Sequence, residues 1–79
     1  MHRLAEKLSW EIVALHDRGT DDSAGARALL AAEIAYGVAL QVGDQPELFS
    51  AFMSSIIGQV SDNDMQQELR RYEVKGLQK

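Results

Sequence analysis

Apolar residues recur at helical spacing along most of the chain, and the strict alternation typical of β-strands is absent. The first segment carries a stripe at an i, i+4, i+8, i+11 spacing, made of Leu4, Leu8, Ile12 and Leu15. This stripe predicts a helix over about residues 2–17. Arg18 and Gly19 predict its end, because a cation suits the last turn of a helix and glycine accepts a left-handed cap.

The stretch 21–42 is rich in alanine and predicts a second helix that is apolar around most of its circumference. Asp21, Asp22 and Ser23 supply oxygens and negative charge for its N-terminus. The narrow polar sector is Ser23, Arg27, Glu33, Gly37 and Gln41, interrupted by Ala26, Leu30 and Ile34. Other helices or a second subunit must cover so apolar a helix, so we expect it at the centre of the fold.

Two further helices are predicted after residue 45. Pro46 suits the first position of the third helix, whose broad apolar face is Leu48, Phe49, Phe52, Met53, Ile56, Ile57 and Val60. The opposite, uncharged face is Ser50, Ala51, Ser54, Ser55 and Gly58. This small-residue face either meets solvent, which we favour, or receives another helix. Ser61, with an acid at Asp64, indicates a capping box that starts the fourth helix, followed by an apolar stripe of Met65, Leu69 and Tyr72.

These patterns predict one domain over residues 1–79, an all-α bundle of about four helices joined by short turns. A chain this short buries only about 60–65% of the surface that its unfolded form exposes, so its stability is expected to be marginal. The chain has no cysteine with which to form a disulfide. Small domains without such a crosslink often gain stability by oligomerising, and we therefore expect a homodimer.

Composition argues against several classes of function. The formal net charge of −4 disfavours a nucleic-acid partner held by phosphate contacts. The apolar run 28–42 is interrupted by Glu33 and is short for a bilayer, and acids lie among the first apolar residues, so we expect a cytoplasmic protein with no membrane segment. Nucleophile, phosphate-loop and zinc-protease motifs are absent, and the only histidines are His2 and His16. We expect no enzyme activity.

We also expect neither a metal nor another cofactor. The acidic clusters at 21–22 and 62–64 lack the spacing of a calcium loop, and helix capping accounts for both of them.

One short pattern points to a different function. Ala39 and Gly43 have the spacing of the first helix and turn of a helix-turn-helix motif, and Phe49 falls where an apolar residue of the second helix is expected. A DNA-binding regulator with its turn within 39–49 is therefore an alternative hypothesis. The segment 45–59, which would read the major groove, contains no lysine or arginine and begins with an acid at Glu47.

The remaining candidates are apolar side chains that one small core cannot bury. Trp10 and Val13 lie off the apolar stripe of the first helix, and either Trp10 lies flat on a neighbouring helix or both form an interaction surface. The predicted interaction residues are Trp10, Val13, Leu29, Tyr36 and Leu40. Surplus apolar surface without catalytic residues predicts a non-enzymatic protein-binding module, a small bacterial or phage inhibitor, adaptor or regulatory protein.

Overall fold

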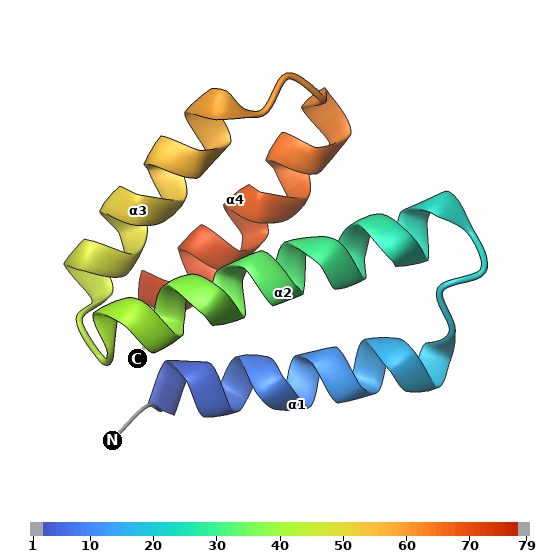
Figure 1. Ribbon diagram of the computed structural model, residues 1–79, viewed down its shortest axis with the longest axis horizontal. Helices are drawn as coiled ribbons and strands as arrows, with labels where there is room; N and C mark the ends of the chain where they lie inside the picture. The colour runs from blue at the N-terminus through green and yellow to red at the C-terminus, as the bar shows by residue number, and fades with distance from the viewer. Residues whose placement is uncertain (1–2, 78–79) are drawn as a thin grey trace.

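The computed structural model describes residues 3–77, with side chains as far as residue 74, and these residues form four α-helices and no strand (Figure 1). The helices are α1 (Arg3–Arg18), α2 (Ser23–Val42), α3 (Pro46–Gln59) and α4 (Asn63–Leu77). The predicted all-helical, compact fold is confirmed. The connections between consecutive helices span only three or four residues, so each helix must fold back beside or across the one before it.

The ends of α1 and α2 follow from local chemistry. Gly19 has a φ of 90°, and its amide donates to the His16 carbonyl at 3.1 Å. Asp22 caps the start of α2, where its Oδ1 accepts from the Gly25 amide at 2.6 Å. Gly43 ends α2 with a φ of 65°, and its amide donates to the Ala39 carbonyl at 2.9 Å. Glycine is the residue that adopts positive φ without steric cost, so both turns depend on it.

The start of α4 differs from the prediction. Asp62 is the capping residue, because its Oδ1 accepts from the Asp64 amide at 3.0 Å. The predicted cap at Ser61 is wrong by one residue, and a charged carboxylate next to the positive end of the helix dipole is the favourable alternative. Gln66 then ties the first turn of α4 to the end of α3, since its Nε2 donates to the Val60 carbonyl at 2.6 Å.

The second helix, α2, packs against each of the other three helices. In Figure 1, α1 runs antiparallel beside α2, while α3 and α4 form a second antiparallel pair that crosses it. The buried side of α2 consists of small or β-branched residues: Ala31, Ala32, Ala35, Val38, Ala39 and Val42. Within residues 3–77, α2 alone is long and apolar enough to cross a membrane by length and composition, a condition that the core helix of a soluble protein also meets.

Larger side chains from α3 and α4 fill the core against these alanines. Phe49, Met53 and Leu69 are the largest side chains that are fully buried. From α1, Leu8 and Leu15 complete the core. Small residues on one helix and large ones on its neighbours allow the close packing that a stable interior requires.

Tyr72 connects α4 to α1. Its side chain is almost completely buried, and its hydroxyl is hydrogen-bonded to Glu11. Burial, together with the nearby negative charges of Glu11 and Glu68, raises the pKa of Tyr72 to about 12. The neutral phenol is thus the form that this contact requires.

The small-residue face of α3 is divided between a helix contact and an exposed part. The hydroxyls of Ser50 and Ser54 donate to Oε1 of Glu73 on α4, at 3.2 and 2.9 Å. The rest of the face is exposed: Ala51, Ser55 and Gly58. The face therefore receives another helix at one edge, where α4 packs, and meets solvent over the rest.

Candidate interaction surfaces

The outer side of α1 exposes the largest apolar side chain on the molecule. Trp10 is 66% exposed and Val13 is 49% exposed. Trp10 lies two residues after the buried Leu8, which is about 200° around the helix, so it points away from α2. The indole therefore does not lie flat on a neighbouring helix. We call the stripe Glu6, Trp10, Val13 and Asp17 the Trp10 surface.

The charges of the Trp10 surface stand at its two ends. Glu6 precedes Trp10 by four residues, and Asp17 follows Val13 by four residues, so both acids share the same side of α1. Both are exposed. Lys7, also exposed, precedes Trp10 by three residues, so the surface is two adjacent apolar side chains with a carboxylate at either end and one cation beside Trp10.

The other three predicted interaction residues share a different stripe, on α2. Leu29, Tyr36 and Leu40 follow an i, i+7, i+11 spacing. Leu29 and Tyr36 are partly buried and pack against the core, whereas Leu40 is 46% exposed. Because Trp10 and Val13 face away from α2, the five predicted residues lie on two separate parts of the molecule.

A second apolar surface lies on α2 and α3. On α2, Leu30 is 51% exposed, and on α3, Leu48 and Phe52 are 44% and 47% exposed. Ile34 follows Leu30 by four residues, and Ile56 follows Phe52 by four, so each helix carries a continuous stripe. We call the set Leu30, Ile34, Leu48, Phe52 and Ile56 the α2–α3 face.

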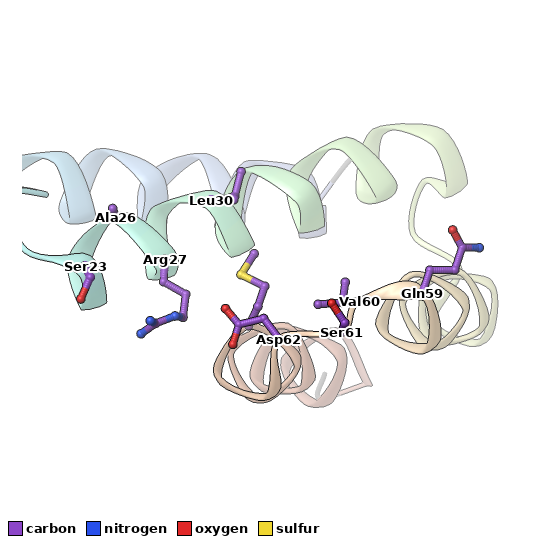
Figure 2. A pocket seen from close by; sticks show the side chains of 9 residues that line it. Ser23, Ala26, Arg27, Leu30, Gln59, Val60, Ser61 and Asp62 are labelled. Atoms are coloured by element: carbon purple, nitrogen blue, oxygen red, sulfur yellow. The ribbon is translucent and has the colours of Figure 1, made fainter.

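An open groove lies beside Leu30, at one end of the α2–α3 face. It lies between α2 and the turn from α3 to α4 (Figure 2). Leu30 lines it from α2, and Gln59 and Val60 line it from the end of α3, one turn after Ile56. The remaining lining residues are Ser23, Ala26, Arg27, Ser61, Asp62 and Met65. Of the five residues of the α2–α3 face, Leu30 alone lines this groove.

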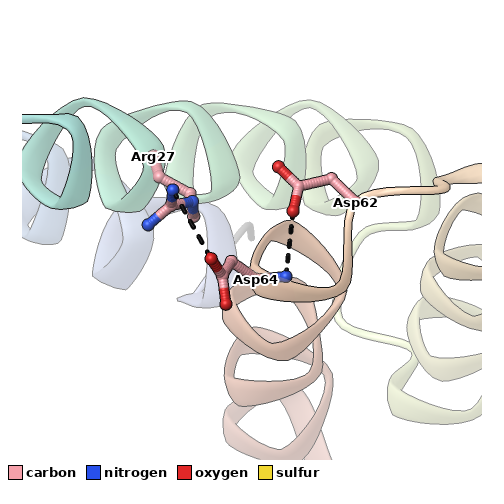
Figure 3. Close-up of polar contacts among 3 residues, drawn as sticks. All are labelled: Arg27, Asp62 and Asp64. Atoms are coloured by element: carbon pink, nitrogen blue, oxygen red, sulfur yellow. Dashed lines mark hydrogen bonds and ion pairs between the residues drawn. The ribbon is translucent and has the colours of Figure 1, made fainter.

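The charged residues of this groove lie at its rim. Arg27 of α2 points toward the start of α4, where its guanidinium lies 3.8 Å from a carboxylate oxygen of Asp64 (Figure 3). Asp62 lies beside this pair but is engaged with the Asp64 amide. Since the Asp64 side chain is about two-thirds exposed, water screens the ion pair. The pair marks the border of the apolar area rather than holding the two helices together.

The sequence pattern contains the residues of the α2–α3 face but does not show which of them are exposed. Leu30 and Ile34 interrupt the polar sector of α2, and Leu48 and Phe52 belong to the broad apolar face of α3. Only the arrangement of the neighbouring helices decides which of these positions is covered. The offset of Trp10 from the apolar stripe, by contrast, depends on α1 alone and was visible in the sequence.

The described residues hold no group of three or more histidine, cysteine or acidic side chains that would bind a metal ion. His16 is exposed at the end of α1, and His2 lies outside the described residues. In the candidate helix-turn-helix segment, Gly43 makes the turn and Phe49 is fully buried. However, α3 offers no lysine or arginine to a phosphate backbone, and its exposed apolar side chains suit protein contact better.

Comparisons of the chain with protein-family models, with curated proteins and with solved structures find no match. Within the described residues, the features that point to a function are the two exposed apolar surfaces and the charges around them.

Proposed function

We propose that this chain is a non-enzymatic protein-binding module that engages another protein through the Trp10 surface. The observation that carries the proposal is the exposure of Trp10, which projects two-thirds of its surface into solvent from a rigid helix. Tryptophan is enriched among the few residues that dominate binding energy at protein interfaces. A large aromatic side chain gains most when it leaves water for a pocket, and the fold covers only about a third of the surface of Trp10.

The flanking charges define the chemistry of the partner. Trp10 and Val13 require an apolar depression, and Glu6 and Asp17 at either end favour basic side chains beside it. The chain as a whole carries a net charge of −4, which steers it toward a basic surface. The partner is therefore a protein with an apolar pocket between lysine or arginine residues.

The mechanism that follows is occlusion. A helix about 24 Å long, estimated from the 16 residues of α1 at about 1.5 Å each, covers an apolar pocket and keeps the partner's other ligands out. This action fits a small bacterial or phage inhibitor, adaptor or regulatory protein that works in the cytoplasm. It requires no cofactor and no chemical step.

The test compares tagged variants as bait in extract from the source cells. The wild type and Val74→Ala, a control at an exposed apolar residue of α4 outside the predicted interaction residues, are expected to recover the same protein. Trp10→Ala and Glu6→Lys are expected to reduce its recovery at least about tenfold. Binding of that purified protein should also shift the fluorescence of Trp10, the only tryptophan, to the blue. The proposal fails if Trp10→Ala loses no partner or if binding leaves the fluorescence unchanged.

A further inference from the structure

We propose that the outer side of α4 binds an acidic segment of another protein, in which carboxylates flank an apolar side chain. The site is an open hollow lined by Gln67, Arg70, Arg71 and Val74, which we call the Arg70 surface. The inference is independent of the proposed function, because the Trp10 surface lies on α1 and shares none of these residues.

The four residues of the Arg70 surface form one stripe along α4. Arg70 and Val74 are four residues apart, as are Gln67 and Arg71, so the two side chains of each pair are neighbours on the helix. At about 100° per residue, Gln67 and Val74 lie along the middle of the stripe, with one arginine on either side. All four residues are exposed, and Val74 exposes 55% of its surface. The stripe thus presents two guanidinium groups beside an apolar centre.

Positive charge is concentrated in this part of the chain. Residues 70–79 contain four of the eight lysines and arginines and one of the twelve acids, although the whole chain has a net charge of −4. Arg71 lies 3.9 Å from Glu68, but its side chain is 73% exposed, so water screens this pair and a partner's carboxylate can replace it. Within residues 3–74, whose side chains the structure describes, Arg70 forms no ion pair. Both guanidinium groups are therefore available to a partner.

The acids of α4 within residues 63–74 do not lie between the two arginines. Asp64 stands at the start of the helix and faces Arg27 of α2 (Figure 3). Glu68 is only partly exposed and lies on the far side of Arg71 from the centre of the stripe. Glu73 accepts hydrogen bonds from two serines of α3. A carboxylate that approaches the centre of the stripe therefore meets the guanidinium groups.

The types of side chain favour a peptide as the occupant. A guanidinium is a planar fork that donates two parallel hydrogen bonds to a carboxylate. Val74 gains from contact with an apolar side chain, which the phosphate backbone of a nucleic acid does not supply. The amide of Gln67 can both donate to and accept from the backbone of a bound segment. A segment with acidic residues around an apolar one satisfies all four residues.

The experiment titrates the ¹⁵N-labelled chain with the end-capped peptide Glu-Asp-Leu-Glu-Leu-Asp-Glu and follows the backbone amides by NMR. We expect the largest shifts at residues 67–74 and a dissociation constant below about 1 mM. The uncharged counterpart Gln-Asn-Leu-Gln-Leu-Asn-Gln should bind at least about tenfold more weakly, because it lacks the carboxylates. The counterpart Glu-Asp-Ser-Glu-Ser-Asp-Glu should bind at least about threefold more weakly, because it lacks the apolar contact.

Variants of the chain locate the site. Arg70→Glu is expected to weaken binding of the acidic peptide at least about tenfold, and Arg70→Gln at least about threefold. The matched control is Arg18→Gln, the same loss of charge at an exposed arginine at the end of α1, which should leave the dissociation constant within about twofold. Circular dichroism checks that each variant keeps its helices.

The two proposals fail independently. Val74→Ala should weaken binding of the acidic peptide and leave recovery of the Trp10 partner unchanged, whereas Trp10→Ala should bind the peptide as the wild type does.

Several outcomes would overturn the inference. One is a wild type that binds the acidic peptide no more tightly than its uncharged counterpart, and another is binding that Arg70→Gln leaves unchanged. A single-stranded hexanucleotide that shifts the amides of residues 67–74 at lower concentration than the peptide would make a nucleic acid the occupant. A molar mass that rises with concentration in the wild type, but not in Arg70→Gln, would make a second copy of the chain the occupant.

Discussion

The Trp10 surface and the α2–α3 face both expose large apolar side chains, yet they differ in their neighbours. On α1 the apolar pair is short, with a carboxylate at either end and Lys7 beside it. On α2, Arg27 and the exposed Glu33 lie within one turn of Leu30, whereas Ser55 and Gln59 beside the stripe of α3 are uncharged. Charges at the edge of an apolar surface favour partners of complementary charge. Exposed apolar area alone therefore does not identify an interface, because the surrounding charges decide which partner fits.

The largest expected effect is the loss of folding stability when a core residue of α3 is truncated, compared with truncation of a residue of the α2–α3 face on the same helix. Phe49 is fully buried and Phe52 is half exposed, three residues apart on α3. We expect Phe49→Ala to lower the free energy of unfolding by about 3–5 kcal/mol, since it removes a core ring and leaves a cavity.

Phe52→Ala is expected to cost less than about 1.5 kcal/mol at protein concentrations where the chain is monomeric. Urea unfolding of both variants is the measurement. Equal losses would show that Phe52 belongs to the core, and the α2–α3 face would then lose its central residue.

The second effect is a loss of folding stability at alkaline pH, when Tyr72, the residue that connects α4 to α1, ionises. The pKa of Tyr72 is raised from 10.0 to about 12 in the folded chain. The stability that follows from the neutral phenol is present below pH 10 and is lost as the pH rises toward 12. Two pKa units correspond to about 2.7 kcal/mol.

Alkaline titration of unfolding stability tests this contact, with Tyr72→Phe as the control. The wild type should lose stability steeply between pH 10 and 12, and Tyr72→Phe should lose much less in that window because it has no phenol to ionise. Parallel curves for the two proteins would mean that the phenol of Tyr72 is not buried in its neutral form in the folded chain.

A smaller effect is expected at Gly37, which borders the α2–α3 face. A Cβ added at Gly37 meets no atom of the same chain. Gly37→Ala should therefore stabilise the monomer by about 0.5–1 kcal/mol, because alanine restricts the unfolded chain and favours helix. Thermal unfolding at low concentration measures this gain. A loss of stability would show that the outer side of α2 is already covered within one chain.

The smallest effect is expected at the rim of the groove. Arg27→Gln removes the ion pair with Asp64, which is partly exposed and should contribute about 0–1 kcal/mol. Unfolding in low and in high salt should show a small difference that salt removes. A loss well above 1 kcal/mol would mean that the charged rim, rather than apolar packing, holds α2 against α4.

Much of the fold could be predicted from the sequence because the residues that mark the helix ends act locally. Gly19, Gly43 and Pro46 mark helix ends through backbone geometry that depends on one or two residues. Asp22 likewise caps α2 as expected. The start of α4 was placed one residue early because Ser61 and Asp62 are both good caps, and only the helix itself shows which side chain accepts the hydrogen bond.

The candidate surfaces could be predicted from the sequence only in part. Trp10 is exposed because it stands opposite the buried stripe of its own helix, which the spacing reveals. Phe49 and Phe52 belong to the same apolar pattern of α3, however, and the positions of α2 and α4 determine that the first is buried and the second is not. Tertiary packing of this kind has no signature in the spacing of residues along one helix.

The fluorescence of Trp10 over a concentration series of the chain alone tests whether the Trp10 surface is free for another protein. Trp10 is the only tryptophan, so its emission reports on α1 alone. We expect the emission to stay that of a water-exposed indole at every concentration, whatever the molar mass. A blue shift that grows with concentration would place the Trp10 surface in a contact between copies of the chain and would contradict the proposed function.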